Sequence, residues 1–311
     1  MKKISILTAC FNEEENVELL YEAVKAQFQK LPEYEYEHLF IDNCSTDQTV
    51  AILKRIAKQD KNIKIIVNAR NFGHIRSPYH GLLQTTGDCT ISLVADLQDP
   101  PELIPELIAK WEEGFSIVTC VKNKSKENPV MFFLRKMFYN TLEKMSDTNQ
   151  IKNFTGFGLY DRSFITVLRE KIDDPYPYFR GLIAELGYNM TSIIYTQPKR
   201  LNGKTKNNFF TLYDMAMLGF VNHSKVPLRL ASFIGFTVAL ASLLVALGYF
   251  IYKIRYWDNF SLGTAPLVIG LFFFSSVQLF FIGIIGEYIG SIHTQVKKRP
   301  YVVEKERINF E

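Results

Sequence analysis

The chain of 311 residues is long enough for one large domain or two small ones, and its 47% hydrophobic content allows a sizeable core. The formal net charge of +4 is modest, so it gives no case for a nucleic-acid partner, and it suits work beside anionic lipid. The four cysteines, Cys10, Cys44, Cys89 and Cys120, have neither Cys-x-x-Cys spacing nor a nearby histidine pattern suited to zinc. They are expected to be reduced thiols in a cytosolic domain.

Strand-like and helix-like segments alternate through the first 200 residues. The stretch Ile4 to Cys10 imitates a signal peptide but runs into three glutamates, so we read it as a first strand. Apolar residues recur at helical spacing from Val17 to Leu31, and a second helix is expected around Leu53, opened by Ser45 and Gln48 at capping-box spacing. The expected strands are Ile4–Ala9, His38–Asp42, Ile63–Asn68, Thr90–Ala95 and Ser116–Val121. Such alternation is typical of a mostly parallel sheet with helices on both faces.

Polar residues follow the ends of these strands, which is where sheets of this kind bind their ligands. No Gly-x-Gly-x-x-Gly follows the first strand and no Gly-Lys-Ser/Thr loop occurs, so dinucleotide and P-loop sites lose their main support. Asp96, Gln98 and Asp99 follow the fourth strand, where a hard cation could bind through one or two protein oxygens and the phosphates of a substrate. The alternative is an Asp-Pro-Pro turn whose acids cap the helix from Glu102.

Two further segments are rich in apolar residues. Residues 130–145 carry a helical stripe that is expected to face a core. Residues 209–221 bear few charges, as expected for a helix that lies in the membrane interface and guides a lipid phosphate toward the metal.

Two uncharged runs, Leu230 to Tyr252 and Asn259 to Gly286, each exceed the ~20 residues that a helix needs to cross a bilayer. Buried helices of a soluble protein are the alternative, although such helices normally keep a charged face. Basic residues flank the pair at Lys225, Arg229 and 297–299, whereas the loop between the runs carries Lys253 and Arg255. Both ends of the pair are therefore expected to face the cytoplasm.

Several motifs together resemble the family 2 inverting glycosyltransferases, and within them the bacterial polyprenyl-phosphate glycosyltransferases related to dolichol-phosphate mannose synthase. The motifs are Cys-Phe-Asn-Glu-Glu-Glu-Asn at 10–16, Ile-Asp-Asn-Cys-Ser-Thr-Asp-Gln-Thr at 41–49, Asn-Phe-Gly-His at 71–74 and Ala-Asp-Leu-Gln-Asp-Pro-Pro-Glu at 95–102. Further matches are Arg-Gly-Leu at 180–182, Pro-Leu-Arg at 227–229 and Gly-Ile-Ile-Gly-Glu-Tyr at 283–288. The resemblance covers nearly the whole chain. It implies a GT-A fold, that is, a Rossmann-like α/β catalytic domain, followed here by a two-helix transmembrane hairpin.

The resemblance also implies a set of site residues. Asp96 and Gln98 would hold Mg²⁺ or Mn²⁺ on the donor diphosphate, and Asp96 and Asp99 would be the catalytic carboxylates. Glu13 and Asp42 would hold the base and ribose of the donor. The candidates for the phosphates of donor and acceptor are Arg70, Arg180, Arg200 and Lys206, and a solvated surface role is the alternative for each.

Four positions depart from the family pattern. Ala9 replaces a proline, and Asn43 replaces the second aspartate of Asp-Asp-Gly-Ser, so base recognition rests on Asp42. Val94 replaces the first acid of Asp-x-Asp, so metal binding rests on Asp96 and its neighbours. Phe157 stands where many relatives carry an aspartate proposed as the catalytic base.

The resulting expectation is an enzyme that moves a sugar from a UDP-hexose or UDP-N-acetylhexosamine, with GDP-mannose second, to polyprenyl (undecaprenyl) phosphate at the inner membrane. The product would supply cell-envelope glycan modification. The expected divisions are 1–200 as catalytic domain, 201–228 as basic loop and interfacial helix, 229–293 as two transmembrane helices and 294–311 as a cytoplasmic tail. A homo-oligomer is compatible with this reading. Alternatives are a non-catalytic partner with a decayed transferase domain, a processive synthase, which lacks its Gln-x-x-Arg-Trp motif here, and a transporter.

Overall fold

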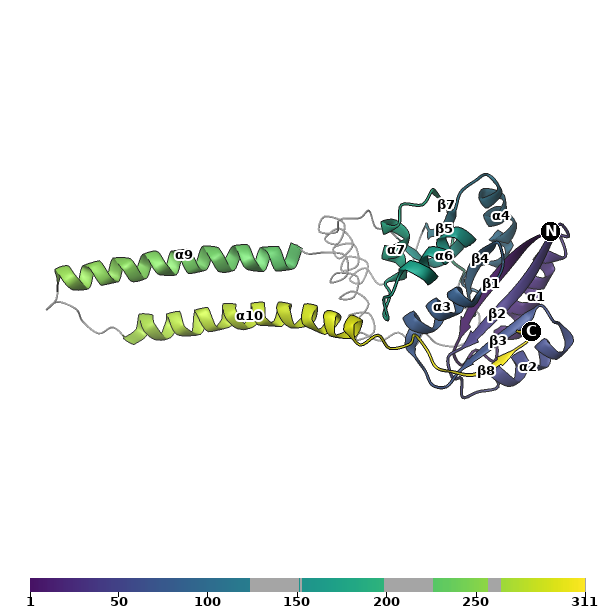
Figure 1. Ribbon diagram of the computed structural model, residues 1–311, viewed down its shortest axis with the longest axis horizontal. Helices are drawn as coiled ribbons and strands as arrows, with labels where there is room; N and C mark the ends of the chain where they lie inside the picture. The colour runs from purple at the N-terminus through teal and green to yellow at the C-terminus, as the bar shows by residue number, and fades with distance from the viewer. Residues whose placement is uncertain (124–150, 152, 199–225, 257–263, 311) are drawn as a thin grey trace.

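The first strand, β1 (Lys2–Cys10), lies inside a mixed eight-stranded sheet in this computed structural model, which describes residues 1–311 except 124–150, 152, 199–225, 257–263 and 311 (Figure 1). The strand order is β7-β5-β6-β4-β1-β2-β3-β8. The other strands are β2 (Tyr34–Asp42), β3 (Ile63–Asn68), β4 (Cys89–Val94), β5 (Ile117–Lys122), β6 (Phe154–Asp161), β7 (Met190–Tyr195) and β8 (Glu304–Ile308). Strands β4, β1, β2 and β3 are parallel, whereas β6 and β8 run antiparallel to their neighbours.

Helices cover both faces of the sheet because each buries one apolar side against it. On one face α1 (Val17–Phe28), α2 (Thr49–Gln59) and α4 (Ile104–Glu112), preceded by the short helix η1 (Pro101–Leu103), share one hydrophobic cluster. On the other face α3 (Gly73–Gln84), α6 (Arg162–Lys171) and α7 (Phe179–Glu185) share a second. A Cβ at Gly81 would lie 2.7 Å from Leu7 Cδ1, so glycine at this position lets α3 approach β1 closely.

All five expected strands are confirmed, although β2 begins four residues earlier than expected, at Tyr34. The expected capping box at Ser45 and Gln48 is wrong: α2 begins at Thr49 with no side-chain cap at Gln48. Ser45 instead bonds to Asp42 and to the backbone of Asn12, because two loops meet there. The expected sheet with helices on both faces is confirmed. The expected helices at 130–145 and 209–221 lie outside the described residues.

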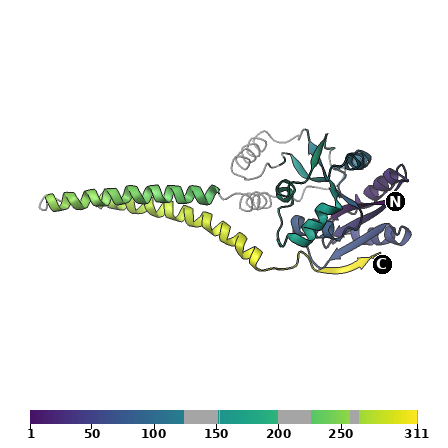
Figure 2. The same ribbon diagram turned by 45° about the horizontal axis from the view of Figure 1, so that its top comes forward.

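The two uncharged runs form long helices, α9 (Val226–Arg255) and α10 (Thr264–Val296), that project together from the α/β domain (Figures 1 and 2). Segments Val226–Tyr252 and Gly270–Val296 are each 27 residues long and apolar enough to cross a membrane. Almost none of their side chains are buried in the isolated chain. Since helices that are apolar all round need an apolar surrounding, this exposure fits a bilayer better than a protein core.

The segment after α10 returns to the α/β domain. Residues 294–311 were expected to be a cytoplasmic tail, and the structure brings Glu304–Ile308 into the sheet as β8, antiparallel to β3. The Ala69 amide donates to the carbonyl of Val303 (2.8 Å), and Asn309 Nδ2 donates to the carbonyls of Ala57 and Ile63 (both 2.8 Å). The chain thus leaves the domain through α9 and closes back onto it after α10.

Candidate active site

The loops after β1, β2 and β4 lie side by side because these strands are parallel and in register. Cys10 pairs with Asp42 at the ends of β1 and β2, and Ala9 pairs with Val94 at the end of β4. The carboxyl ends of parallel strands form one edge of the sheet, and this edge is where ligands of such folds bind. The motifs that carry the resemblance therefore converge in space.

The first two loops are held together by hydrogen bonds. Asn12 donates its backbone N–H to Ser45 Oγ (2.8 Å), and its Oδ1 accepts from the Thr46 amide (2.8 Å). Asn12 takes a left-handed backbone (φ 54°), a conformation that asparagine tolerates better than most residues. Glu13, the expected contact for the donor, lies half-buried in this loop, and its Oε2 accepts from Asn16 Nδ2 (2.7 Å).

Asp42 is fully buried at the end of β2. Its Oδ1 accepts from Ser45 Oγ (2.5 Å) and its Oδ2 accepts from the Ser45 amide (2.9 Å). Burial raises the pKa of Asp42, and the bonds from Ser45 oppose that rise. Through its bonds to Ser45, the Asp42 carboxylate stabilises the turn of the second loop. The expected contact of Asp42 with the ribose or base of the donor remains a prediction.

Asn43, the residue in place of a second aspartate, joins two loops. Its Nδ2 donates to Asn71 Oδ1 (2.9 Å) and to the Gly73 carbonyl (3.1 Å). Its Oδ1 accepts from the Phe72 amide (2.8 Å) and from Asn68 Nδ2 (3.2 Å). A carboxylate could not donate the first two bonds. The departure from the family pattern therefore has a structural role, which is to fix the loop that follows β3.

The loop after β4 carries the expected metal ligands. Leu97 has a left-handed backbone (φ 59°), and the Gln98 amide donates to Asp96 Oδ1 (3.1 Å), so a tight turn holds these residues. Val94, in place of the first acid of Asp-x-Asp, is 43% exposed. This exposed apolar side chain at the end of β4 lines a cavity, at the position where the family carries a charge.

Asp99 anchors this turn to the sheet. Only 3% of it is exposed; its Oδ2 accepts from the Val94 amide (3.2 Å) and its Oδ1 from the Tyr195 hydroxyl (3.1 Å). Burial raises the pKa of Asp99 to about 6, against the charge of Lys122, which lowers it. Tyr195, at the end of β7, was not anticipated as part of the site, because nothing in the sequence signalled that β7 would end beside Asp99.

Phe157 fills the position of the expected base with an aromatic ring. It is 1% exposed on β6, and its ring lies edge-on to Tyr195, with centroids 5.4 Å apart. The preceding Gly156 has φ +105°, a backbone conformation that favours glycine. The site therefore has an apolar wall behind Asp99 in place of a second carboxylate.

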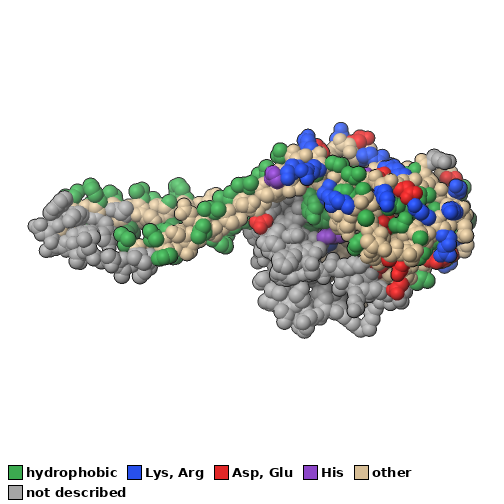
Figure 3. Space-filling model, turned by 90° about the horizontal axis from the view of Figure 1, so that it is seen from below, with side chains coloured by type: hydrophobic (Ala, Val, Ile, Leu, Met, Phe, Trp, Pro, Cys, Tyr) green, Lys and Arg blue, Asp and Glu red, His purple; other side chains and the backbone are tan. Residues whose placement is uncertain are grey.

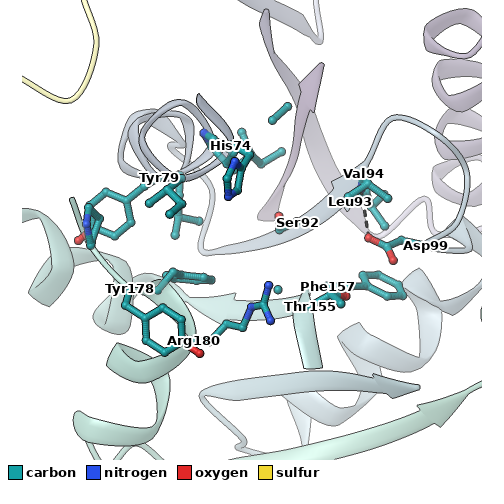
Figure 4. Close-up of a pocket in the computed structure, with 18 residues that line it drawn as sticks. His74, Tyr79, Ser92, Leu93, Val94, Asp99, Thr155, Phe157, Tyr178 and Arg180 are labelled. Atoms are coloured by element: carbon teal, nitrogen blue, oxygen red, sulfur yellow. Dashed lines mark hydrogen bonds between the residues drawn. The ribbon is translucent and has the colours of Figure 1, made fainter. Parts of the chain in front are cut away.

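A cavity of about 210 Å³ lies between β1, β4, β6, α3 and the start of α7. Figure 4 shows Arg180 reaching into it from α7, with His74 on the wall formed by α3 and Asp99 on the side of Phe157. A buried carboxylate and a guanidinium thus border one space that is large enough for part of a sugar or a phosphate. His74 belongs to the Asn-Phe-Gly-His motif, but no role was assigned to it from the sequence.

The predicted site residues are distributed around this edge of the sheet. Asp99 and Arg180 line the cavity, and Asp96 and Gln98 lie in the adjoining turn. Glu13, Asp42 and Arg70 lie in the loops that follow β1, at the end of β2 and after β3. Arg200 and Lys206 lie outside the described residues.

Comparison with known proteins agrees with this arrangement. The sequence profile of glycosyl transferase family 2 matches residues 5–173, and that of the GtrB C-terminal hairpin matches residues 226–292. The chain is 32% identical to the bactoprenol glucosyl transferase of Shigella phage SfII over 97% of this chain and 98% of that one. It is 33% identical to the uncharacterized glycosyltransferase YkcC of Bacillus subtilis over 97% of this chain and 93% of that one. The crystal structure of a mycobacterial protein superposes with a TM-score of 0.52 at 15% identity over 71% of this chain and 73% of that one, which shows the fold alone.

The α/β sheet with its carboxylate-bearing strand ends and these matches define a glycosyltransferase of the GT-A type. The chain belongs to glycosyl transferase family 2. The expected family, fold and enzyme class are therefore confirmed. The hairpin match and the two long apolar helices identify it as a membrane protein.

Proposed function

We propose that the chain is an inverting glycosyltransferase that moves a sugar from a nucleotide diphosphate to polyprenyl phosphate, the undecaprenyl lipid in bacteria. The observation that carries this proposal is the match to a bactoprenol glucosyl transferase, which extends over 97% of this chain and so includes the hairpin and the returning tail. A lipid acceptor explains why the catalytic domain is connected to both ends of a membrane hairpin. The lipid-linked sugar would then supply cell-envelope glycan modification.

The acceptor phosphate would attack the anomeric carbon while the bond from that carbon to the nucleotide diphosphate breaks. The second pKa of a phosphate monoester is ~6, so the attacking oxygen is already anionic at neutral pH. Transfer then does not require a strong general base. This chemistry is compatible with Phe157, which replaces the expected carboxylate with a buried ring.

Asp96 and Gln98 offer a carboxylate and an amide oxygen, the ligand types that hard divalent cations prefer. Among the residues that the structure describes, no group of three or more His, Cys, Asp or Glu side chains could hold a metal by itself. This donor set fits Mg²⁺ or Mn²⁺ that binds mainly through the donor diphosphate and water. The cation would supply positive charge for the departing diphosphate. Arg180 offers a second positive charge, from the cavity wall.

In the same proposal the donor is a UDP-hexose or UDP-N-acetylhexosamine whose base and ribose bind near Glu13 and Asp42. Arg70, Arg200 and Lys206 would contact phosphates of donor and acceptor. The catalytic domain and both chain ends would face the cytoplasm. Two observations support this orientation. β8, which follows α10, pairs with β3, which precedes α9, so the described parts of the chain before and after the hairpin belong to one α/β domain. Basic residues, Arg229 and 297–299, flank the spans.

The proposal is tested with the full chain in lipid nanodiscs that contain undecaprenyl phosphate. UDP-glucose, UDP-N-acetylglucosamine and GDP-mannose are offered in turn, and release of nucleoside diphosphate is followed. We expect release that requires the lipid phosphate and is fastest with one of the UDP-sugars. Release that is equal with and without the lipid would contradict a lipid acceptor, since only hydrolysis would then be observed.

Asp96→Asn should lower kcat at least a hundredfold, because loss of charge stabilisation at the departing group typically costs about 3–4 kcal/mol. EDTA should stop the unmutated enzyme, and Mg²⁺ or Mn²⁺ should restore it. The thermal midpoint of the variant serves as the folding control. Full activity in metal-free buffer would show that the turn at Asp96 does not hold a cation.

A further inference from the structure

Three arginines converge at the start of α3, outside the cavity. The guanidinium carbon of Arg70 lies 4.0 Å from the ring centre of Phe72, and that of Arg76 lies 5.4 Å from the same centre. Arg76 Nη2 also donates to the carbonyl of Pro300 (2.5 Å), which brings the neighbouring Arg299 of the returning tail to the same place. Three arginines from separate segments of the chain therefore lie around the Phe72 ring and the carbonyl of Pro300.

Arg70 and Arg76 donate to backbone carbonyls, those of Asn71 and Pro300. In the described part of the chain, none of the three arginines forms an ion pair with a carboxylate. Arg76 Nε is buried and has no hydrogen-bond partner among the described residues. Burial lowers the pKa of Arg76, and the charges of Arg70 and Arg299 lower it further while Tyr176 opposes them. Mutual repulsion of this kind is relieved when an anion binds between the charges.

The cluster lies close to the predicted membrane surface. Arg299 comes three residues after Val296, the last residue of the second candidate span. The bond from Arg76 to Pro300 fixes the start of α3 at the same level. Figure 3 shows Lys and Arg side chains gathered where α10 meets the α/β domain. Basic side chains this close to a span lie within reach of lipid headgroups.

Two members of the cluster, Arg76 and Arg299, are separate from the site described above, whereas Arg70 was assigned there to substrate phosphate. The first turns of α3 line the cavity with His74, Ile75 and Pro78, whereas Arg76 and Arg299 are not among the lining residues. A phosphate held by this cluster therefore lies beside the cavity wall and outside the cavity itself. Because this position lies outside the cavity, the phosphate that binds there is expected to belong to a lipid of the surrounding bilayer and not to the reacting acceptor.

We propose that Arg76 and Arg299, beside Arg70, form a binding site for the phosphate of an anionic phospholipid, which docks the catalytic domain against the membrane surface. Arginine suits this task because its planar guanidinium can donate two parallel hydrogen bonds to a phosphate. The site joins the catalytic domain to the tail that follows the hairpin. Bound lipid would thus hold the start of α3 and the returning tail together at the bilayer. The proposal needs a membrane but does not depend on which sugar or acceptor the enzyme uses.

The test uses the full chain in nanodiscs of phosphatidylcholine, with or without phosphatidylglycerol, and no substrate. Hydrogen exchange is measured at residues 70–76 and 297–303. We expect phosphatidylglycerol to slow exchange in both segments. Arg299→Gln and Arg76→Gln should each reduce that effect about fivefold, the factor that corresponds to ~1 kcal/mol for one basic side chain at an anionic surface. Arg299 is exposed, so its variant is expected to fold even if Arg76→Gln perturbs the contact with Pro300.

Arg55→Gln is the matched control, because Arg55 is an exposed arginine on α2 that pairs with Glu18. It should retain the full response to phosphatidylglycerol. Equal exchange in neutral and anionic nanodiscs would overturn the proposal. So would protection that appears in neutral nanodiscs only when undecaprenyl phosphate is added, because the cluster would then serve the acceptor. Since no turnover is measured, these outcomes are independent of whether the proposed transfer occurs.

Discussion

His38 is a titratable residue that β2 buries completely. Its Nε2 lies 3.0 Å from Thr8 Oγ1, its ring stacks on Phe40 with centroids 3.9 Å apart, and its Nδ1 has no partner among the described residues. Burial lowers the pKa of His38 to about 3. Between pH ~6.5, where an unfolded histidine titrates, and pH 3, the unfolded chain therefore binds one more proton than the folded chain. Stability must fall as pH decreases through this window.

From this residue alone, we expect the catalytic domain to lose about 2 kcal/mol of stability between pH 7 and pH 5. His38→Phe keeps the ring stack and removes the titrating group, so its stability should depend less on pH. Thermal midpoints at pH 7, 6 and 5 are compared for the two proteins. Parallel pH profiles would mean that the pKa of His38 is the same in the folded and the unfolded chain.

Asn43 makes a second prediction at the level of single residues. Asn43→Asp restores the acid that the family carries, but it removes two donated bonds and places a charge beside Asp42 at a position only 7% exposed. We expect a loss of about 2 kcal/mol in stability and weaker binding of the donor, since the loop after β3 would lose its fixed place. Thermal unfolding and titration with UDP measure the two effects. A variant as stable as the parent that binds UDP more tightly would show that the missing acid, rather than the amide, matters here.

The sequence located the chemical groups better than it described their roles. Asp42, Asp96 and Asp99 follow apolar runs that form strands, so their place at one edge of the sheet could be predicted from the pattern. The hydrogen bonds of Asn43 and Tyr195 could not, because each joins segments that are far apart in the chain. At position 43 the sequence alone does not distinguish an asparagine that links two loops from an acid that contacts the nucleotide base, because both occupy the same position in the motif.

At the scale of elements, β8 is the feature with the largest consequence. It pairs with β3, and Glu306 and Glu304 on it contact Lys54 (2.6 Å) and His80 (2.5 Å). The β3 edge would be open without it, and an open edge invites pairing with another chain. The segment reads as a polar tail in the sequence because it is mostly charged, and only its cross-strand partners reveal it as a strand.

A chain that ends at residue 222 should therefore aggregate or unfold at lower temperature than one in which a flexible linker replaces residues 226–296 and the tail is kept. Both lack the hairpin, so the comparison isolates β8. Size-exclusion chromatography and thermal unfolding distinguish the two. Equal solubility and equal midpoints would show that β8 contributes nothing to the sheet.

The central strands were predictable because β1 to β5 are short apolar runs, whereas β6 and β7 were not expected. β6 contains Gly156 and Gly158, which weaken a strand signal, and β7 ends at Tyr195 beside a loop with no recognisable motif. The two long helices were the clearest signal of all. Their lack of charge over more than 20 residues leaves few structures other than a membrane span.

At the scale of the whole molecule, the hairpin is an insertion between the catalytic domain and its last strand (Figure 1). The chain enters the hairpin after the α/β domain and returns to the same domain as β8, so this domain is connected to both helices. An enzyme that uses a soluble donor and a lipid acceptor needs this geometry. In the proposed function, the acceptor phosphate would reach the cavity by diffusion within the membrane plane.

The most direct test of this account is the mass of the lipid product. The full chain is incubated in membranes with undecaprenyl phosphate and the UDP-sugar that it turns over, and the extracted lipid is analysed by mass spectrometry beside Asp96→Asn. The account predicts undecaprenyl phosphate that carries one added sugar residue, absent with the variant. Unmodified lipid despite consumption of the UDP-sugar, or a lipid bearing a growing sugar chain, would contradict it.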